Sequence, residues 1–106
     1  MYKIFFFSPQ SHTEDIKEAM FSAGGGQQGN YKRCSWQTKG QGQFQAKKGA
    51  NPFLGDIGKL EIVNEDKVEM LVSDEKLDNV IEALKEAHPY EEPAFEVYRI
   101  FETFNK

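Results

Sequence analysis

The segment AHPYEEPAFEVY near the C-terminus contains the residue types that could hold a metal ion. His88 offers an imidazole, Glu91 and Glu92 offer carboxylates, and Cys34 could add a thiolate if the fold brought it close. A protein metal site needs three or four such ligands to converge. The same residues also suit a structural role, because a histidine fits the carboxyl end of a helix and the proline after it stops that helix. Both interpretations stay open: a divalent-metal site, or a stiff corner between a helix and a strand.

A second candidate lies in the glycine-rich middle of the chain, where all nine glycines fall between residues 24 and 58. Backbone amides together with Lys39, Lys47 and Lys48 could bind a small anion there. The segment matches neither the phosphate-binding loop G-x-x-x-x-G-K-[ST] nor the dinucleotide motif G-x-G-x-x-G. It is therefore either a nucleotide or anion sensor formed by the 39–55 loop, or a surface loop without a ligand.

Catalysis has weaker support in the residue types. His12 and His88 are the only two histidines, too few for a typical catalytic zinc or two-metal site built on histidine. Cys34 lies next to Trp36 in an expected strand, and no general base is implied beside it, so it is expected to be a small buried hydrophobe. We therefore expect no enzyme.

Length and charge limit the class of protein. A chain of 106 residues suits one domain, spanning 1–106. The net charge is −4, and residues 59–106 are strongly acidic, which argues against nucleic-acid binding. One cysteine excludes an internal disulfide, and the N-terminal apolar run of four residues is too short for a signal peptide or a membrane span. These features predict a soluble, cytoplasmic protein that binds no membrane.

Hydrophobic periodicity predicts the order β-α-β-β-α-β. A capping box at Ser11 and Glu14 should start the first helix, and turns are expected at residues 40–42 and 64–66. Strands are expected at residues 2–7, 30–46, 59–73 and 94–101, and helices at 11–23 and 73–88. This order is typical of an α+β, ferredoxin-like fold, with two helices on one face of an antiparallel sheet and an extra hairpin or loop in the middle.

The other face of that sheet is also expected to be apolar. Phe5, Phe7, Val97 and Phe101 are the residues that we expect to pack in the core or between sheets. A monomer rarely leaves such a patch in water. The sequence therefore predicts a closed homo-oligomer in which the sheets face one another.

Five segments of the chain follow a known pattern in the same order: GNYKRCSW, GQGQF, GANPFLGDIG, KLEIVNEDKVE and HPYEEPAFEVY. Together they resemble the PII/CutA-like domain that is inserted in NGG-interacting-factor-like proteins, also called GTP cyclohydrolase type 2-like proteins. The resemblance covers nearly the whole chain, and the HPYE corner is similar to one in CutA proteins. It implies a trimer with its sheets packed inward. It also places residues 38–57 where PII proteins carry the long loop that contacts small anionic ligands and partner proteins.

The resemblance also bears on activity. It implies that the presumed hydrolase chemistry of the parent proteins lies in a different domain with clustered metal-binding histidines and acids, a motif that no residue here matches. It therefore implies a non-enzymatic regulatory or binding module. CutA proteins are associated with divalent metals, and only His88 and its neighbours could carry that association in this chain.

Overall fold

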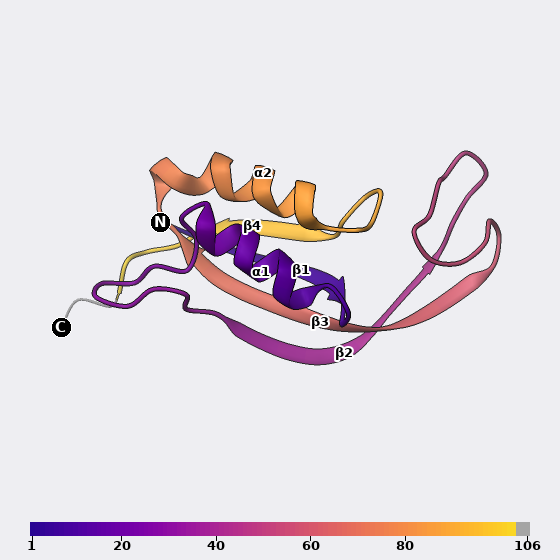
Figure 1. The fold of residues 1–106 in the computed structure, drawn as a ribbon, viewed down its shortest axis with the longest axis horizontal. Coiled ribbons are helices and arrows are strands. Elements are labelled where there is room, and N and C mark those ends of the chain that lie inside the picture. Colours follow the sequence, from indigo (N-terminus) through magenta and orange to yellow (C-terminus); the bar gives the residue numbers. More distant parts are fainter. Residues whose placement is uncertain (104–106) are drawn as a thin grey trace.

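The computed structural model describes residues 1–103 and shows the predicted alternation of strands and helices (Figure 1). The elements in chain order are β1 (Tyr2–Pro9), α1 (Thr13–Ser22), β2 (Trp36–Gln45), β3 (Leu60–Val72), the short 3-10 helix η1 (Asp74–Lys76), α2 (Leu77–Ala87) and β4 (Phe95–Arg99). The predicted order β-α-β-β-α-β is confirmed.

The four strands form one antiparallel sheet in the order β2-β3-β1-β4. Ile4 in the central strand β1 pairs with Met70 of β3 on one side and with Val97 of β4 on the other. Both helices cover the same face of this sheet (Figure 1). The ferredoxin-like fold predicted from the sequence is therefore confirmed. Among residues 1–103, no helix combines the length and the apolar character that crossing a membrane requires.

The hydrophobic core lies between the helices and the sheet because alternate strand residues point to that side. Its buried members are Ile4, Phe6, Ile16, Met20, Val68, Met70, Val72, Val80 and Leu84. Removing each such side chain from water contributes about 1.5–3 kcal/mol of hydrophobic stabilisation. Val97 packs against the same core, as expected, whereas Phe101 lies beyond β4 with 91% of its surface exposed and is not part of it.

The strands β2 and β3 continue past the end of β1, whose pairing with β3 stops at Pro9 and Glu65. We call the projecting part, residues 41–64, the arm. The arm extends well beyond the helices (Figure 1), and the molecule measures 51 × 24 × 23 Å along its principal axes. A two-stranded ribbon is marginally stable by itself, so side-chain contacts with the body must hold the arm in place.

The two turns predicted in this region are wrong. Gly40 and Gly42 lie inside β2, paired with Glu65 and Val63 of β3, and residues 64–66 lie inside β3. The long ladder between β2 and β3 supplies backbone hydrogen bonds that override the weak strand propensity of glycine and asparagine. The extra hairpin in the middle of the chain is therefore a single long one, closed by the loop at residues 46–59.

The predicted capping box is also wrong. The N-cap of α1 is His12, and its side chain makes no capping hydrogen bond. The hydroxyl of Ser11 instead lies 2.8 Å from Nδ1 of His12. Because that hydroxyl is already engaged with a neighbouring ring, Ser11 does not cap the helix together with Glu14.

A buried chain of polar groups holds the start of α1 instead. The Thr13 hydroxyl donates to Oδ2 of Asp66 at 2.7 Å, and the Ser8 hydroxyl lies 2.7 Å from the same Thr13 oxygen. Asp66 is 4% exposed, and its second carboxylate oxygen has no hydrogen-bond partner in the described structure. The link therefore joins α1 to β3 through a single hydroxyl proton donated to a buried carboxylate.

The expected strand at residues 30–46 begins later than predicted, at Trp36. Cys34 precedes it in a loop, half-buried rather than buried, and its backbone N–H donates to the carbonyl of Gly26 at 2.8 Å. Arg33 beside it has a φ of 59°, a left-handed conformation that interrupts an extended strand. The assignment of Cys34 to a strand as a buried hydrophobe was therefore wrong.

Candidate functional site

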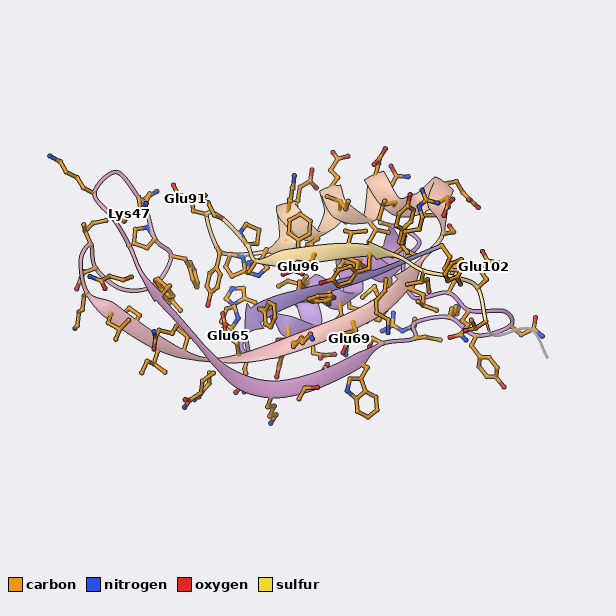
Figure 2. All side chains as sticks on the ribbon, turned by 180° about the vertical axis from the view of Figure 1, so that it is seen from behind. Lys47, Glu65, Glu69, Glu91, Glu96 and Glu102 are labelled. Carbon is orange, nitrogen blue, oxygen red and sulfur yellow. The ribbon has the colours of Figure 1, made fainter. Side chains whose placement is uncertain are left out.

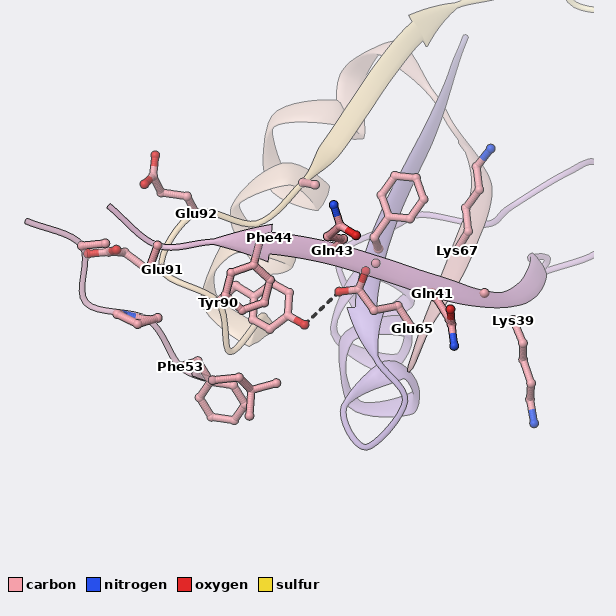
Figure 3. A pocket seen from close by; sticks show the side chains of 18 of the residues that line it. Lys39, Gln41, Gln43, Phe44, Phe53, Glu65, Lys67, Tyr90, Glu91 and Glu92 are labelled. Carbon is pink, nitrogen blue, oxygen red and sulfur yellow. Dashed lines mark hydrogen bonds between the residues drawn. The ribbon is translucent and has the colours of Figure 1, made fainter. Parts of the chain in front are cut away.

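A cavity of about 740 Å³ opens on the helix-free face of the sheet, where the arm leaves the body (Figure 3). Its lining comes from β1, β2, β3 and two loops. One is the loop at residues 46–59, which we call the arm loop, and the other is the segment between α2 and β4, residues 88–94, which we call the corner. Ligand sites in proteins commonly have volumes of about 300–1,000 Å³. The cavity is large enough for a small organic molecule.

Three aromatic rings from distant parts of the chain meet in this cavity. Tyr90 of the corner lies between Phe44 of β2 and Phe53 of the arm loop, with ring centroids 6.3 Å apart in each case. We call these three residues the aromatic cluster. They form an apolar wall and connect the arm to the body through Tyr90, and Phe53 also packs against His12 of the body with centroids 5.4 Å apart.

The hydroxyl of Tyr90 donates a hydrogen bond of 2.8 Å to Oε2 of Glu65 on β3 (Figure 3). Burial, followed by the hydrogen bond to this carboxylate, raises the pKa of Tyr90 well above its usual value. A side chain at Gly42 would overlap the Glu65 carboxylate. The carboxylate fits there because glycine has no side chain. The Tyr90 phenol therefore stays protonated and serves as a hydrogen-bond donor.

His88 connects the corner to β1 through hydrogen bonds of its ring nitrogens. Its Nε2 lies 2.7 Å from the carbonyl of Phe7, and its Nδ1 lies 3.1 Å from the backbone N–H of Tyr90. A carbonyl can only accept and an N–H can only donate, so Nε2 carries the proton and Nδ1 accepts. Burial lowers the pKa of His88, although the hydrogen bond to Phe7 opposes that shift. Both nitrogens of this neutral ring are engaged within the protein.

The two carboxylates of the predicted metal site lie in the same corner as His88. Glu91 accepts a hydrogen bond of 3.0 Å from the backbone N–H of Asn51, which ties the corner to the arm loop, and Glu92 is exposed. Within residues 1–103, no three histidine, cysteine or acidic side chains converge in a way that could hold a metal ion.

Cys34, the fourth predicted ligand, lies at the opposite end of the sheet. Its neighbour Gly26 bonds to the carbonyl of Leu71, which pairs with Lys3 at the start of β1. His88 instead bonds to the carbonyl of Phe7, towards the other end of β1. The fold does not bring the predicted thiolate and imidazole together.

The three predicted lysines are also dispersed. Lys39 lines the cavity, but its ammonium points away from the aromatic cluster (Figure 3). Lys47 and Lys48 lie in the exposed arm loop outside the lining, and Lys47 projects away from the molecule (Figure 2). Sequence reasoning missed the aromatic cluster and Glu65, although Phe53, an apolar side chain within a loop, required a packing partner.

The ferredoxin-like fold of this chain is similar to that of CutA and PII-like proteins of known structure. The CutA protein of Archaeoglobus fulgidus matches 98% of this chain and 88% of its own at a TM-score of 0.68 and 17% identity. The PII-like protein CutA from Nostoc sp. PCC 7120 matches 94% of this chain and 81% of its own at a TM-score of 0.63 and 19% identity. At these identities the likeness establishes the fold alone. No family model matches the chain.

Sequence similarity then identifies more specific relatives. A GTP cyclohydrolase 1 type 2 homolog of Halalkalibacterium halodurans is 43% identical over 92% of this chain and 26% of its own length, and one of Bacillus subtilis is 35% identical over 95% and 27%. A Bacillus cereus protein related to NIF3 superposes at a TM-score of 0.79 with 36% identity, over 92% of this chain and 24% of its own. The chain is homologous to one segment of these NIF3-like proteins and spans about a quarter of their length. The resemblance inferred from the sequence is confirmed.

Proposed function

We propose that this chain is a non-enzymatic, trimeric binding module of the PII/CutA-like type, whose ligand site is the cavity under the arm. The cavity is the observation that carries the proposal. It combines apolar rings with a few fixed polar groups, which is the usual make-up of a small-molecule site. Its lining falls largely within residues 38–57, the segment for which the resemblance implies ligand or partner contacts.

The lining supports binding rather than catalysis. No histidine, cysteine or serine of the described chain contributes to it, so the lining lacks the Ser–His and Cys–His pairs that commonly supply a nucleophile and its base. The relatives' name mentions GTP cyclohydrolase, but this chain spans only about a quarter of those proteins. Incubation of the purified chain with GTP and Zn²⁺ or Mn²⁺ is expected to give no turnover. Turnover that one point substitution abolishes would overturn this part of the proposal.

The helix-free face of the sheet supports self-association. Phe5 packs against Tyr98 and Phe7 on that face, with centroids 5.4 and 6.3 Å apart, and Tyr98 keeps 53% of its surface exposed. The outer edges of β2 and β4 also leave backbone groups unpaired within the sheet. Three copies whose sheets face inward would cover these rings. The single cysteine suits a reducing compartment, and the proposal places the trimer in the cytoplasm.

Light scattering tests the assembly. We expect the mass of three chains at micromolar concentration, and a shift to one chain for Tyr98→Asp, which puts a charge into the interface. Glu82→Lys, on an exposed position of α2, is the control and should keep the mass of three chains. A mass of one chain for the unmodified protein would overturn the trimer.

A further inference from the structure

The arrangement of the aromatic cluster indicates what the cavity can bind. A cation attracts an aromatic face when it lies within about 6 Å of the ring centroid. Tyr90 is 6.3 Å from Phe44 and 6.3 Å from Phe53, and the ring planes are tilted by 55° and 48°. One positive group can therefore contact Tyr90 and a second ring at favourable distance.

The charges of the lining also favour a positively charged ligand. The cavity is lined by four carboxylates, those of Glu65, Glu69, Glu91 and Glu92, and by two lysines. Within residues 1–103, Glu69 pairs with Lys3 at 3.8 Å, whereas the other three carboxylates have no ion-pair partner. The site therefore has a surplus of negative charge.

The two lysines do not offset this charge at the rings. The ammonium of Lys67 lies 4.5 Å from the ring centroid of Phe5, outside the aromatic cluster, and Lys39 points away from Tyr90 (Figure 3). Glu65 is the carboxylate fixed against the cluster, because it accepts the Tyr90 hydroxyl through Oε2. Its Oε1 lies against Gly42 of the cavity lining and accepts no hydrogen bond within residues 1–103, so it remains available to a positive ligand.

We infer that the cavity selects an organic cation, an ammonium group carrying an apolar body, and that Glu65, Tyr90 and Phe53 recognise it. The inference rests on the proposed binding function and specifies its ligand class. The apolar body would lie along Phe44 and Phe53, and the ammonium would sit between the Tyr90 face and the Glu65 carboxylate. A small anion, the class suggested by the lysines in the sequence, would meet the carboxylates and no converging ammonium group.

Three probes of similar size test the charge preference: benzyltrimethylammonium, benzyl alcohol and benzenesulfonate. Each is titrated into the isotope-labelled full chain while amide resonances are followed by NMR. We expect saturable shifts at Tyr90, Glu91 and Gly42 with the ammonium, at an affinity about fivefold or more above that of either other probe. The affinity should fall as salt is raised, because a charged contact in an open cavity is screened.

Variants separate recognition from folding. Glu65→Gln keeps an oxygen that can accept the Tyr90 hydroxyl but removes the charge, and Phe53→Leu removes a ring. Each should weaken benzyltrimethylammonium binding about fivefold with an unchanged amide spectrum elsewhere. Lys47→Ala lies outside the lining and should bind as the unmodified chain does.

The outcomes distinguish the ligand class from the binding function. Tighter binding of benzenesulfonate at the same amides, with the mass of three chains intact, would overturn the cation inference and leave the binding module standing. Unchanged affinity in Glu65→Gln, or no shift with the ammonium, would also overturn the inference. A mass of one chain would count against the trimer alone.

Discussion

The Tyr90 hydroxyl and the Glu65 carboxylate join the corner to strand β3 through a hydrogen bond of 2.8 Å. The two residues are 25 positions apart in the chain, and each lines the cavity. Glu65 is the last residue of β3 that pairs with β1, so it lies at the base of the arm, and its carboxylate occupies the space beside Gly42 of the arm. The Asn51 N–H bond to Glu91 ties the arm itself to the corner. The position of the arm should therefore depend measurably on the Tyr90 and Glu65 pair.

The first prediction concerns the Tyr90 hydroxyl. Tyr90→Phe keeps the ring and removes the donor to Glu65. It should lower the free energy of unfolding by about 1 kcal/mol, the typical net value of such a bond at a half-buried site. Urea unfolding followed by fluorescence measures this change.

Tyr31→Phe is the control for that variant. Tyr31 is 76% exposed, and its hydroxyl makes no hydrogen bond within residues 1–103. No change outside measurement error is expected, because this hydroxyl is solvated in both the folded and the unfolded chain. Equal losses in the two variants would contradict the role given to the Tyr90 and Glu65 pair.

The second prediction compares two glycines on the same face of β2. An alanine methyl at Gly42 would overlap the Glu65 carboxylate, whereas nothing lies within 4 Å of the same position at Gly40. Gly42→Ala should displace Glu65, break its bond to Tyr90 and cost about 1 kcal/mol. Gly40→Ala should be neutral or slightly stabilising, because alanine loses less backbone entropy than glycine.

A double variant tests whether Gly42 acts through that bond. In a Tyr90→Phe background, Gly42→Ala should cost less than it does alone, because the bond is already absent. Fully additive losses in urea unfolding would show that the methyl destabilises the arm by another route.

Much of the fold could be predicted from periodicity. The apolar stripe that includes Val80 and Leu84 predicted α2, and both residues are fully buried. The turns expected at residues 40–42 and 64–66 were wrong. They were predicted from the local propensities of glycine and asparagine, whereas a ten-residue ladder between β2 and β3 determines the backbone conformation there. Long-range pairing of this kind leaves no local signal.

The candidate site was predicted less well, for a related reason. The lysines and the residues around His88 were predicted as site residues from their chemical type alone. In the structure the lysines lie apart from one another, and both ring nitrogens of His88 form hydrogen bonds within the protein. The aromatic cluster depends on three segments meeting, and nothing in the sequence near Phe44 indicates Tyr90 as its neighbour. The structural interpretation of the corner, a helix end followed by a stiff connection, agrees with the contacts of His88.

The third prediction is a dependence of stability on pH. Burial lowers the pKa of His88 below its usual value of about 6.5. As pH falls below about 6.5, the unfolded chain takes up a proton at His88 that the folded chain does not. The free energy of unfolding should therefore fall between pH 6.5 and the lower folded pKa.

His88→Gln isolates that contribution. Its side-chain amide can still donate to the Phe7 carbonyl, but it does not titrate. The variant should lose less stability than the unmodified chain between pH 7 and pH 5, and the two profiles should run parallel above pH 7.5. An identical decline in both, measured by urea unfolding at each pH, would exclude His88 as its source.

The fourth prediction concerns the buried carboxylate under α1. Thr13→Val keeps the shape of the side chain but removes the hydroxyl that donates to Asp66. The carboxylate is 4% exposed and its other oxygen is already without a partner in the described structure, so the variant would leave it with no donor there. The expected loss is about 1–3 kcal/mol, the cost of an unsatisfied buried polar group.

The matching test pairs that change with Asp66→Asn, which removes the charge. An unpaired neutral amide costs less to bury than an unpaired carboxylate, so Thr13→Val should be less destabilising in the Asp66→Asn background. The difference, about 1 kcal/mol in a double-mutant cycle, measures the coupling between the two side chains. A cycle with no coupling would mean that the Thr13 hydroxyl stabilises α1 through Ser8 or the backbone rather than through Asp66.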